Sequence, residues 1–200
     1  MLHDCDAEII PIEPDAGNAA AGIASTIVMV CEAVSIPYRL FKYANRGTSA
    51  NDNSMRYLCV LTIAGSDSCG GAGVQADIKT MSALGVYAAS AITSVTVQNT
   101  LGVKAIQAIE PAIVAGQIKA VMDDVKPVAI KIGMVNDCAT IHAIADSLSS
   151  YSPSKLVVDP VMASTSGSML MQRDALEVFC SELLPMATLL TPNIPEAEVL

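Results

Sequence analysis

Four glycines follow an apolar run, and their spacing suits a loop that holds a ligand. Residues 58–64 are apolar or β-branched, which predicts a strand buried on both faces. Gly65, Gly70, Gly71 and Gly73 come next, and glycine lets a backbone bend sharply and approach a ligand closely. A helix that opens after such a loop offers free N–H groups to an anion or a polar small molecule. The alternative is an ordinary strand-to-helix turn that is rich in glycine.

Two well-known nucleotide loops fit this segment poorly. Gly65 and Gly70 have P-loop spacing, but Gly71 and Ala72 stand where that loop needs Lys and Ser or Thr, so no lysine is placed there for a phosphate. Residues 71–76 match the G-x-G-x-x-A pattern of dinucleotide-binding folds, yet residues 96–100 contain no acid to hold a ribose. The segment therefore predicts a ligand loop and argues against an NAD site.

Residues 57–80 resemble the start of hydroxymethylpyrimidine/phosphomethylpyrimidine kinase, the thiamine-pathway member of the ribokinase-like superfamily. Four further segments agree with that family in the same order. They are Ile92-Thr-Ser-Val-Thr-Val-Gln-Asn-Thr100, Ile130-Lys-Ile-Gly-Met134, Val157-Val-Asp-Pro-Val-Met162 and Leu190-Thr-Pro-Asn-Ile-Pro-Glu-Ala-Glu198. The resemblance covers residues 55–200. It implies ATP-dependent phosphorylation of 4-amino-5-hydroxymethyl-2-methylpyrimidine and of its monophosphate.

The resemblance also implies a pyrimidine pocket. Gln98 matches the family residue that binds the pyrimidine, Asp77 matches a second pocket residue, and Gly65, Met134 and Val161 match positions that line it. An amide or a carboxylate suits the donors and acceptors on an aminopyrimidine edge, and Met and Val suit the face of the ring. Judged by spacing alone, Gln98 would cap a loop, Asp77 would be an exposed acid in the first helical turns, and the Met and Val would be core residues.

A second group of residues points to a magnesium site for ATP. Asp159 closes a predicted strand, at the end where doubly wound folds bind ligands. Asn193 and Glu196 form an N-x-x-E element that resembles the superfamily's metal-organising motif. Hard oxygen ligands, partly through water, are what Mg²⁺ accepts. The same spacing also suits a capping box for a helix beginning near Ile194, and both interpretations can hold together.

One part of the family pattern does not occur in the sequence. Kinases of this kind carry a late Gly-Thr-Gly-Cys segment that opens a helix, holds the transferring phosphoryl group and supplies the catalytic residue. These 200 residues contain no such segment, so we assign no catalytic residue. Because phosphoryl transfer depends on positioning and charge stabilisation, we expect a severe loss of rate. The resemblance thus predicts a chain that is incomplete at its C-terminus and leaves a sheet edge open.

Three rival hypotheses remain beside a thiamine-pathway kinase. A pyridoxal kinase-like enzyme shares the fold and a similar ring substrate, but Gln98 within Val97-Gln-Asn-Thr100 favours the pyrimidine. A non-catalytic pyrimidine-binding module would bind the ligand without turnover. A non-functional gene fragment would fold poorly and aggregate through an open sheet edge.

Residues 1–54 precede Met55, which resembles the natural start of such a kinase, and we identify no family in them. Residues 1–15 are acidic and irregular, residues 19–34 are apolar and could form a helix, and residues 44–54 have a linker composition. The apolar run is too short for a membrane span, and acidic residues precede it, unlike a secretory signal. An accessory helix, a remnant of an upstream gene and a wrongly assigned start codon are all open, and we favour the last two.

Composition limits the partners. A hydrophobic content of 52% supports one sizeable core, while 4% aromatics, no Trp and a net charge of −9 argue against nucleic acid and anionic membranes. Six cysteines without a C-x-x-C pair argue against zinc and suggest free thiols in a reducing cytoplasm. His142 is isolated, and we interpret it as a surface residue. Related kinases commonly pair, so a homodimer is one option.

The elements that must position these residues alternate along the chain. Strands are predicted at 57–64, 87–97, 103–109, 128–132, 155–159 and 188–191, and helices at 73–84, 111–124, 137–149 and 173–184. Pro111 suits a first helical position, Asn136 an N-cap, and Gly85 a helix C-terminus. Residues 165–168 suggest a mobile surface loop. The alternation predicts an α/β fold, which the resemblance makes a ribokinase-like three-layer αβα architecture with a mainly parallel sheet.

Overall fold

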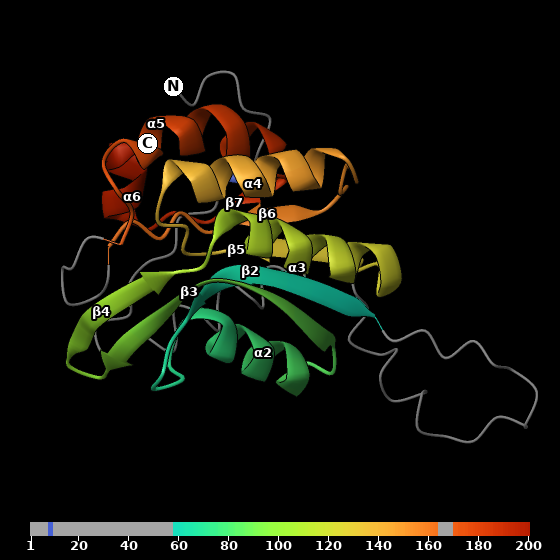
Figure 1. Cartoon of the computed structure of the whole chain (residues 1–200), viewed down its shortest axis with the longest axis horizontal. Helices are drawn as coiled ribbons and strands as arrows, with labels where there is room; N and C mark the ends of the chain where they lie inside the picture. The colour runs from blue at the N-terminus through green and yellow to red at the C-terminus, as the bar shows by residue number, and fades with distance from the viewer. Residues whose placement is uncertain (1–7, 10–57, 164–169) are drawn as a thin grey trace, which may run out of the picture.

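The protein is built on one mainly parallel sheet, seen here in a computed structural model that describes residues 8–9, 58–163 and 170–200. Its seven strands lie in the order β1-β7-β6-β5-β2-β3-β4 (Figure 1). All neighbours run parallel except β3 and β4, which are antiparallel. The strands are β1 (Glu8–Ile9), β2 (Cys59–Ser66), β3 (Tyr87–Asn99), β4 (Gly102–Ala108), β5 (Ala129–Ile132), β6 (Leu156–Val158) and β7 (Leu189–Leu190). The predicted sheet is confirmed.

Helices cover both faces of this sheet. Helix α2 packs on one face against β2 and β3, while α3 and α4 lie on the other (Figure 1). The larger core joins β2, β5 and β6 to α3, α4 and the segment after Ala175, whereas a smaller cluster packs Met81 of α2 against Val60. The helical elements are α2 (Gly73–Ala83), α3 (Pro111–Asp124), α4 (Cys138–Ser149), α5 (Ala175–Val178), the π-helical turn η3 (Phe179–Leu183), the 3₁₀ turn η4 (Leu184–Met186) and α6 (Ile194–Val199). The three-layer prediction is confirmed.

The central strands alternate between these two cores, and their polar residues are informative. In β2 and β5 the residues Leu61, Ile63, Ile130 and Ile132 all belong to the larger core. The residues between them point to the face that α2 covers. There Thr62 and Lys131 stand side by side in register, and both are buried. The sheet therefore places a lysine beneath helix α2.

Local signals at the helix ends were partly right. Pro111 opens α3, and Gly85 follows α2 with φ 78°, as predicted. Asn136 as the N-cap of α4 is wrong. Asp137 takes that position because its carboxylate accepts the Thr140 N–H at 2.9 Å, whereas the Asn136 side chain is buried and donates to the Leu170 carbonyl.

The predicted helix 173–184 is shorter and less regular than expected. Only Ala175–Val178 is α-helical, and the chain continues as η3 and η4. The wider π turn places Phe179 and Leu183 in the core, and Pro185, which has no N–H, sits where regular helical hydrogen bonding stops.

Some predictions lie outside the described residues, among them the loop at 165–168 and most of the segment 1–54. Within that segment, β1 is described and pairs parallel with β7. Strand β7 therefore has a neighbour on both sides, and the two-residue strand β1 forms the edge of the described sheet on that side. Among the described helices, none combines the length and hydropathy that a membrane crossing needs.

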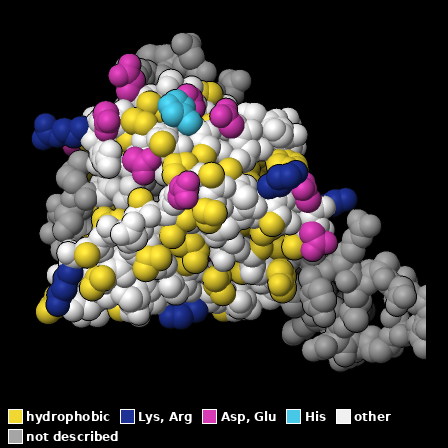
Figure 2. All heavy atoms as spheres, viewed as in Figure 1, with side chains coloured by type: hydrophobic (Ala, Val, Ile, Leu, Met, Phe, Trp, Pro, Cys, Tyr) yellow, Lys and Arg dark blue, Asp and Glu magenta, His cyan; other side chains and the backbone are white. Residues whose placement is uncertain are grey.

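Charged side chains on the surface are scattered. The face shown in Figure 2 carries separate acidic side chains and a few basic ones. His142 is 51% exposed and contacts Glu182 at 2.8 Å, so the prediction of a surface histidine is confirmed.

Candidate active site at the carboxyl edge of the sheet

The glycine loop is organised by a buried carboxylate, Asp67, directly after β2. Its two oxygens accept the backbone N–H groups of Cys69, Gly71 and Ala72 at 2.8–2.9 Å, and its side chain is almost fully buried. Burial raises the pKa of the Asp67 carboxyl, but these hydrogen bonds outweigh it and lower the pKa below its ordinary value. These amides belong to the loop and to the residue before helix α2, which begins at Gly73, so they are not the helix N–H groups that we expected to be free for an anion.

Helix α2 is tied to the same loop by two of its side chains. Gln75 Oε1 accepts the Asp67 N–H at 2.8 Å, and Lys79 Nζ donates to the Gly70 carbonyl at 2.8 Å. Lys79 therefore reaches the loop from the helix, although no lysine stands at the P-loop position. The loop conformation is therefore stabilised by Asp67 within the loop and by Gln75 and Lys79 from helix α2.

The structure brings Gln98, at the end of β3, beside the glycine loop. Ser68 joins them, because its hydroxyl donates to the Gln98 carbonyl at 2.9 Å and accepts the Gln98 N–H at 3.0 Å. Thr96 adds a hydrogen bond from its hydroxyl to the Ser66 carbonyl at 2.7 Å. The Ser68 bonds use only the backbone of Gln98, while the Gln98 side-chain Oε1 accepts a longer hydrogen bond from the Thr96 hydroxyl at 3.3 Å. The NH₂ group of this half-buried amide remains available to a ligand.

Gly65 and Met134 are also brought together. A Cβ at Gly65 would lie 2.3 Å from Met134 Cε and 2.7 Å from Ser94 Oγ, so a larger residue there would require both side chains to move. The Met134 side chain thus packs directly on the backbone of Gly65. Val161 lies farther along the sheet, after β6, and is half-buried. Among the described residues, the buried Ser94 hydroxyl has no hydrogen-bond partner.

Asp77 is not the exposed acid that spacing alone suggested. It is fully buried on α2, accepts a hydrogen bond from Thr62 at 2.5 Å and lies 3.1 Å from Lys131 Nζ. Lys131 also contacts Asp159 at 3.7 Å. Burial lowers the pKa of Lys131, but the charges of the two aspartates outweigh it and raise the pKa above its ordinary value. A ligand would reach Asp77 only if these neighbours moved, so its contact with a pyrimidine stays a prediction.

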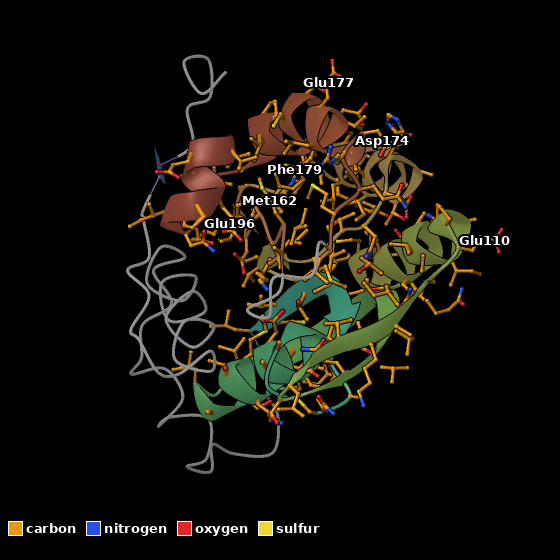
Figure 3. All side chains as sticks on the ribbon, turned by 90° about the vertical axis from the view of Figure 1, so that its left-hand side faces the viewer. Glu110, Met162, Asp174, Glu177, Phe179 and Glu196 are labelled. Atoms are coloured by element: carbon orange, nitrogen blue, oxygen red, sulfur yellow. The ribbon has the colours of Figure 1, made fainter. Side chains whose placement is uncertain are left out.

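Asn193 and Glu196 form the capping box at the start of α6. The Asn193 side chain accepts the Glu196 N–H, and the Glu196 carboxylate accepts the Asn193 N–H, both at 2.9 Å. Glu196 lies beside Met162 at the end of the sheet (Figure 3). Burial raises the pKa of Glu196, the Asn193 hydrogen bond opposes this, and the charge of Asp159 raises it further. The capping interpretation is confirmed.

The oxygen donors at this end of the sheet suit a hard cation. Asp159 is 17% exposed, and the nearby strand end carries a buried Thr191 hydroxyl without a partner among the described residues. Burial raises the pKa of Asp159, although the charge of Lys131 opposes this. In the described part of the chain, no cluster of three or more Asp, Glu, His or Cys residues could hold a metal by itself. The residues fit a cation bound by one or two carboxylates, with water and phosphate completing its shell.

The described residues also form a cavity of about 510 Å³ elsewhere, between β4 and the segment before α5. None of the predicted site residues lines it. Its walls are Ile106, Ala108, Asn136, Asp137, Leu170, Met171, Gln172 and Arg173. This cavity is therefore separate from the predicted pyrimidine pocket.

Sequence reasoning gave no role to Asp67, Ser68 or Lys131. For Lys131 a signal existed, because a lysine within an otherwise apolar strand must find a charged partner if it is buried. Asp67 and Ser68 carry no comparable signal, since their partners become neighbours only when the loop closes on β3.

Comparison with known proteins identifies the family. The sequence profile described as phosphomethylpyrimidine kinase matches residues 67–200. A crystal structure of phosphomethylpyrimidine kinase from Clostridium difficile 630 superposes with a TM-score of 0.68 at 51% identity, covering 71% of this chain and 62% of that one. The chain belongs to the phosphomethylpyrimidine kinase family, within a fold of the ribokinase-like type.

Relatives of known sequence set the extent of the match. The hydroxymethylpyrimidine/phosphomethylpyrimidine kinase of Rhizobium meliloti (strain 1021) is 53% identical over 140 residues, which are 70% of this chain and 52% of that protein. A pyridoxal kinase of Bacillus subtilis superposes with a TM-score of 0.62 at 31% identity, and the match covers 71% of this chain and 52% of the pyridoxal kinase chain. The chain thus spans about half the length of the curated relatives that it matches.

One relative extends the match toward the N-terminus. The thiamine biosynthesis bifunctional protein ThiED of Geobacter sulfurreducens is 41% identical over 197 residues, covering 94% of this chain and 40% of that protein. Residues 55–200 are 146 of 200 residues, or 73% of the chain. The alignment therefore includes residues before Met55.

Proposed function

We propose that this chain carries the hydroxymethylpyrimidine site of a kinase that acts in thiamine biosynthesis. The kinase transfers phosphate from ATP to the hydroxymethyl oxygen of 4-amino-5-hydroxymethyl-2-methylpyrimidine, and then to the monophosphate. The observation that carries this proposal is the junction of Gln98 with the glycine loop through Ser68. It leaves a side-chain amide beside a loop built from family motifs.

Each proposed pocket residue has a distinct task. The Gln98 amide donates to and accepts from the edge of the pyrimidine. Gly65, Met134 and Val161 contact the face of the ring, with the flexible Met134 side chain adjusting over Gly65. Asp77 is the least accessible of the proposed contacts, because Thr62 and Lys131 already occupy its oxygens.

We place the Mg²⁺ that accompanies ATP at the end of β6. Asp159 and Glu196 would hold it, directly or through water, with Asn193 keeping Glu196 in place through the capping box. Bound there, Mg²⁺ would neutralise charge on the phosphates. The protein's part is to supply the carboxylates and to keep α6 at this edge of the sheet.

The remaining parts of the proposal concern the setting of the enzyme. We assign residues 55–200 to the kinase domain, leave residues 1–54 without a role, and place the protein in the cytoplasm. A homodimer and a lack of nucleic-acid or membrane partners complete the proposal.

Phosphate transfer tests the proposal. The purified 200-residue chain is incubated with MgATP and hydroxymethylpyrimidine, and the product is followed by ³¹P NMR, with pyridoxal as the competing substrate. Transfer to the pyrimidine in preference to pyridoxal supports the kinase. Pyrimidine binding without transfer agrees both with the expected loss of rate and with a binding module. Preference for pyridoxal in transfer and in binding contradicts the substrate assignment.

A further inference from the structure

Lys131 is a buried cation that the proposed reaction does not use directly. Only 4% of its side chain is exposed, and its strand β5 is otherwise apolar. A buried ammonium is costly unless it is paired, so its partners define its purpose. Both partners, Asp77 and Asp159, come from elements that frame the candidate site.

The two aspartates share this lysine unequally. Lys131 Nζ lies 3.1 Å and 3.3 Å from the two oxygens of Asp77, but 3.7 Å from Asp159. Asp77 is fully buried and has Thr62 as a second donor, whereas Asp159 is 17% exposed. One ammonium between two carboxylates leaves a net charge of −1, and the geometry leaves it mainly on Asp159.

Space for the ammonium is provided by Gly133. A Cβ at that position would lie 2.8 Å from Lys131 Nζ and 3.1 Å from Ala64 Cβ, both closer than side chains normally pack. The lysine head therefore occupies room that a larger residue after β5 would take. The position of the Lys131 ammonium therefore depends on the space left by Gly133 as well as on the charges of the aspartates.

We propose that Asp77 holds Lys131 away from Asp159, so that Asp159 stays free to attract a divalent cation. Lys131 and Asp77 are then positioning residues, and Asp77 acts on the site through the lysine. This inference rests on the proposed function only in taking Asp159 as the cation ligand. The alternative is that the Lys131–Asp77 pair stabilises the fold alone.

Cation binding by a single variant and a double variant distinguishes the positioning role of the Lys131–Asp77 pair from a purely structural one. Mn²⁺ alone is titrated into the full chain, and free Mn²⁺ is followed by electron paramagnetic resonance. In Asp77→Asn the lysine loses its charged partner and turns to Asp159, so Mn²⁺ affinity should fall about thirtyfold, the effect of one unit charge on a divalent cation near 4 Å in a water-like dielectric. Asp77→Asn with Lys131→Met should recover wild-type affinity, because the competing ammonium is gone.

Controls keep the result clear. Asp159→Asn should abolish the Mn²⁺ binding measured in the wild type, and thermal unfolding verifies that each variant is folded. Any of three results would overturn the inference. They are an unchanged Mn²⁺ affinity in Asp77→Asn, no recovery of affinity in the double variant, and no Asp159-dependent Mn²⁺ binding in the wild type. Pyrimidine binding by the wild type is independent of these outcomes, so a failure here leaves the proposed pyrimidine site standing. Only the absence of Asp159-dependent binding would also remove the proposed Mg²⁺ site.

Discussion

Gly73 lies directly against the carbonyl of Gly65, across the loop that joins β2 to α2. A Cβ at Gly73 would sit 2.2 Å from the Gly65 oxygen, and Gly73 has φ 56°. Backbone contact and a left-handed conformation both require glycine here. The start of α2 is thereby fixed against the end of β2.

Gly73→Ala is therefore expected to destabilise the protein by more than about 1 kcal/mol, because both the conformation and the contact oppose a side chain. Gly116→Ala is the matched control, since a Cβ at Gly116 in α3 meets nothing within 4 Å. That substitution should stabilise by up to about 1 kcal/mol. Urea unfolding measures both changes, and equal effects would contradict this account of the loop.

The Asp67 carboxylate should make stability depend on pH. Its pKa is lowered in the folded state, so its stabilising contribution is complete above the unfolded value of about 3.9 and is lost as pH falls through the folded pKa. Asp67→Asn should cost about 1–3 kcal/mol at neutral pH, because buried donors lose a charged acceptor.

Urea unfolding between neutral and acidic pH checks this. The loss of stability on acidification should be smaller in Asp67→Asn than in the wild type. Asp146→Asn, which changes an exposed carboxylate on α4, is the control and should follow the wild type. If the free energy of unfolding of Asp67→Asn changed with pH as steeply as that of the wild type, the loop would not depend on this charge.

Two neighbouring hydroxyls in β3 should respond oppositely to removal. Thr93 donates to the Met134 carbonyl at 2.8 Å, whereas Ser94 Oγ is buried without a partner among the described residues. Thr93→Val should cost about 1–3 kcal/mol because it leaves a buried carbonyl unpaired. Ser94→Ala should be neutral or stabilising, since it removes an unpaired buried polar atom.

Thermal unfolding of the two variants gives the comparison. Equal destabilisation would mean that Ser94 has a hydrogen bond in solution, for example to an ordered water. The result also bears on the pocket, because Ser94 packs beside the site where Met134 covers Gly65.

Much of the fold followed from the sequence because it depends on local patterns. Apolar runs identified the central strands, and Pro111 and Gly85 marked helix ends that the structure keeps. The buried partners could not be read in this way. Lys131 and Asp77 are 54 residues apart, and only the pairing of β5 with β2 beneath α2 brings them together. The N-cap of α4 was misplaced because two adjacent polar residues compete, and burial decides between them.

The residues of the candidate site were also only partly predictable from the sequence. Family motifs selected Gln98, Gly65 and Met134, and the structure places each of them at the carboxyl edge of the sheet near the glycine loop. The role of Asp67 depends on loop closure, which no spacing rule states. Tertiary contacts thus define how the loop amides are used.

Binding of hydroxymethylpyrimidine by wild type and Gln98→Ala, measured by calorimetry, tests the central claim most directly. The alanine variant keeps the junction with Ser68, because that junction uses only the Gln98 backbone. Gln107→Ala, which removes an exposed amide on β4, is the control. The account predicts that the wild type and the control bind alike and that Gln98→Ala binds about two- to tenfold more weakly, the size of one lost hydrogen bond. Equal binding by Gln98→Ala, or no binding by the wild type, would contradict it.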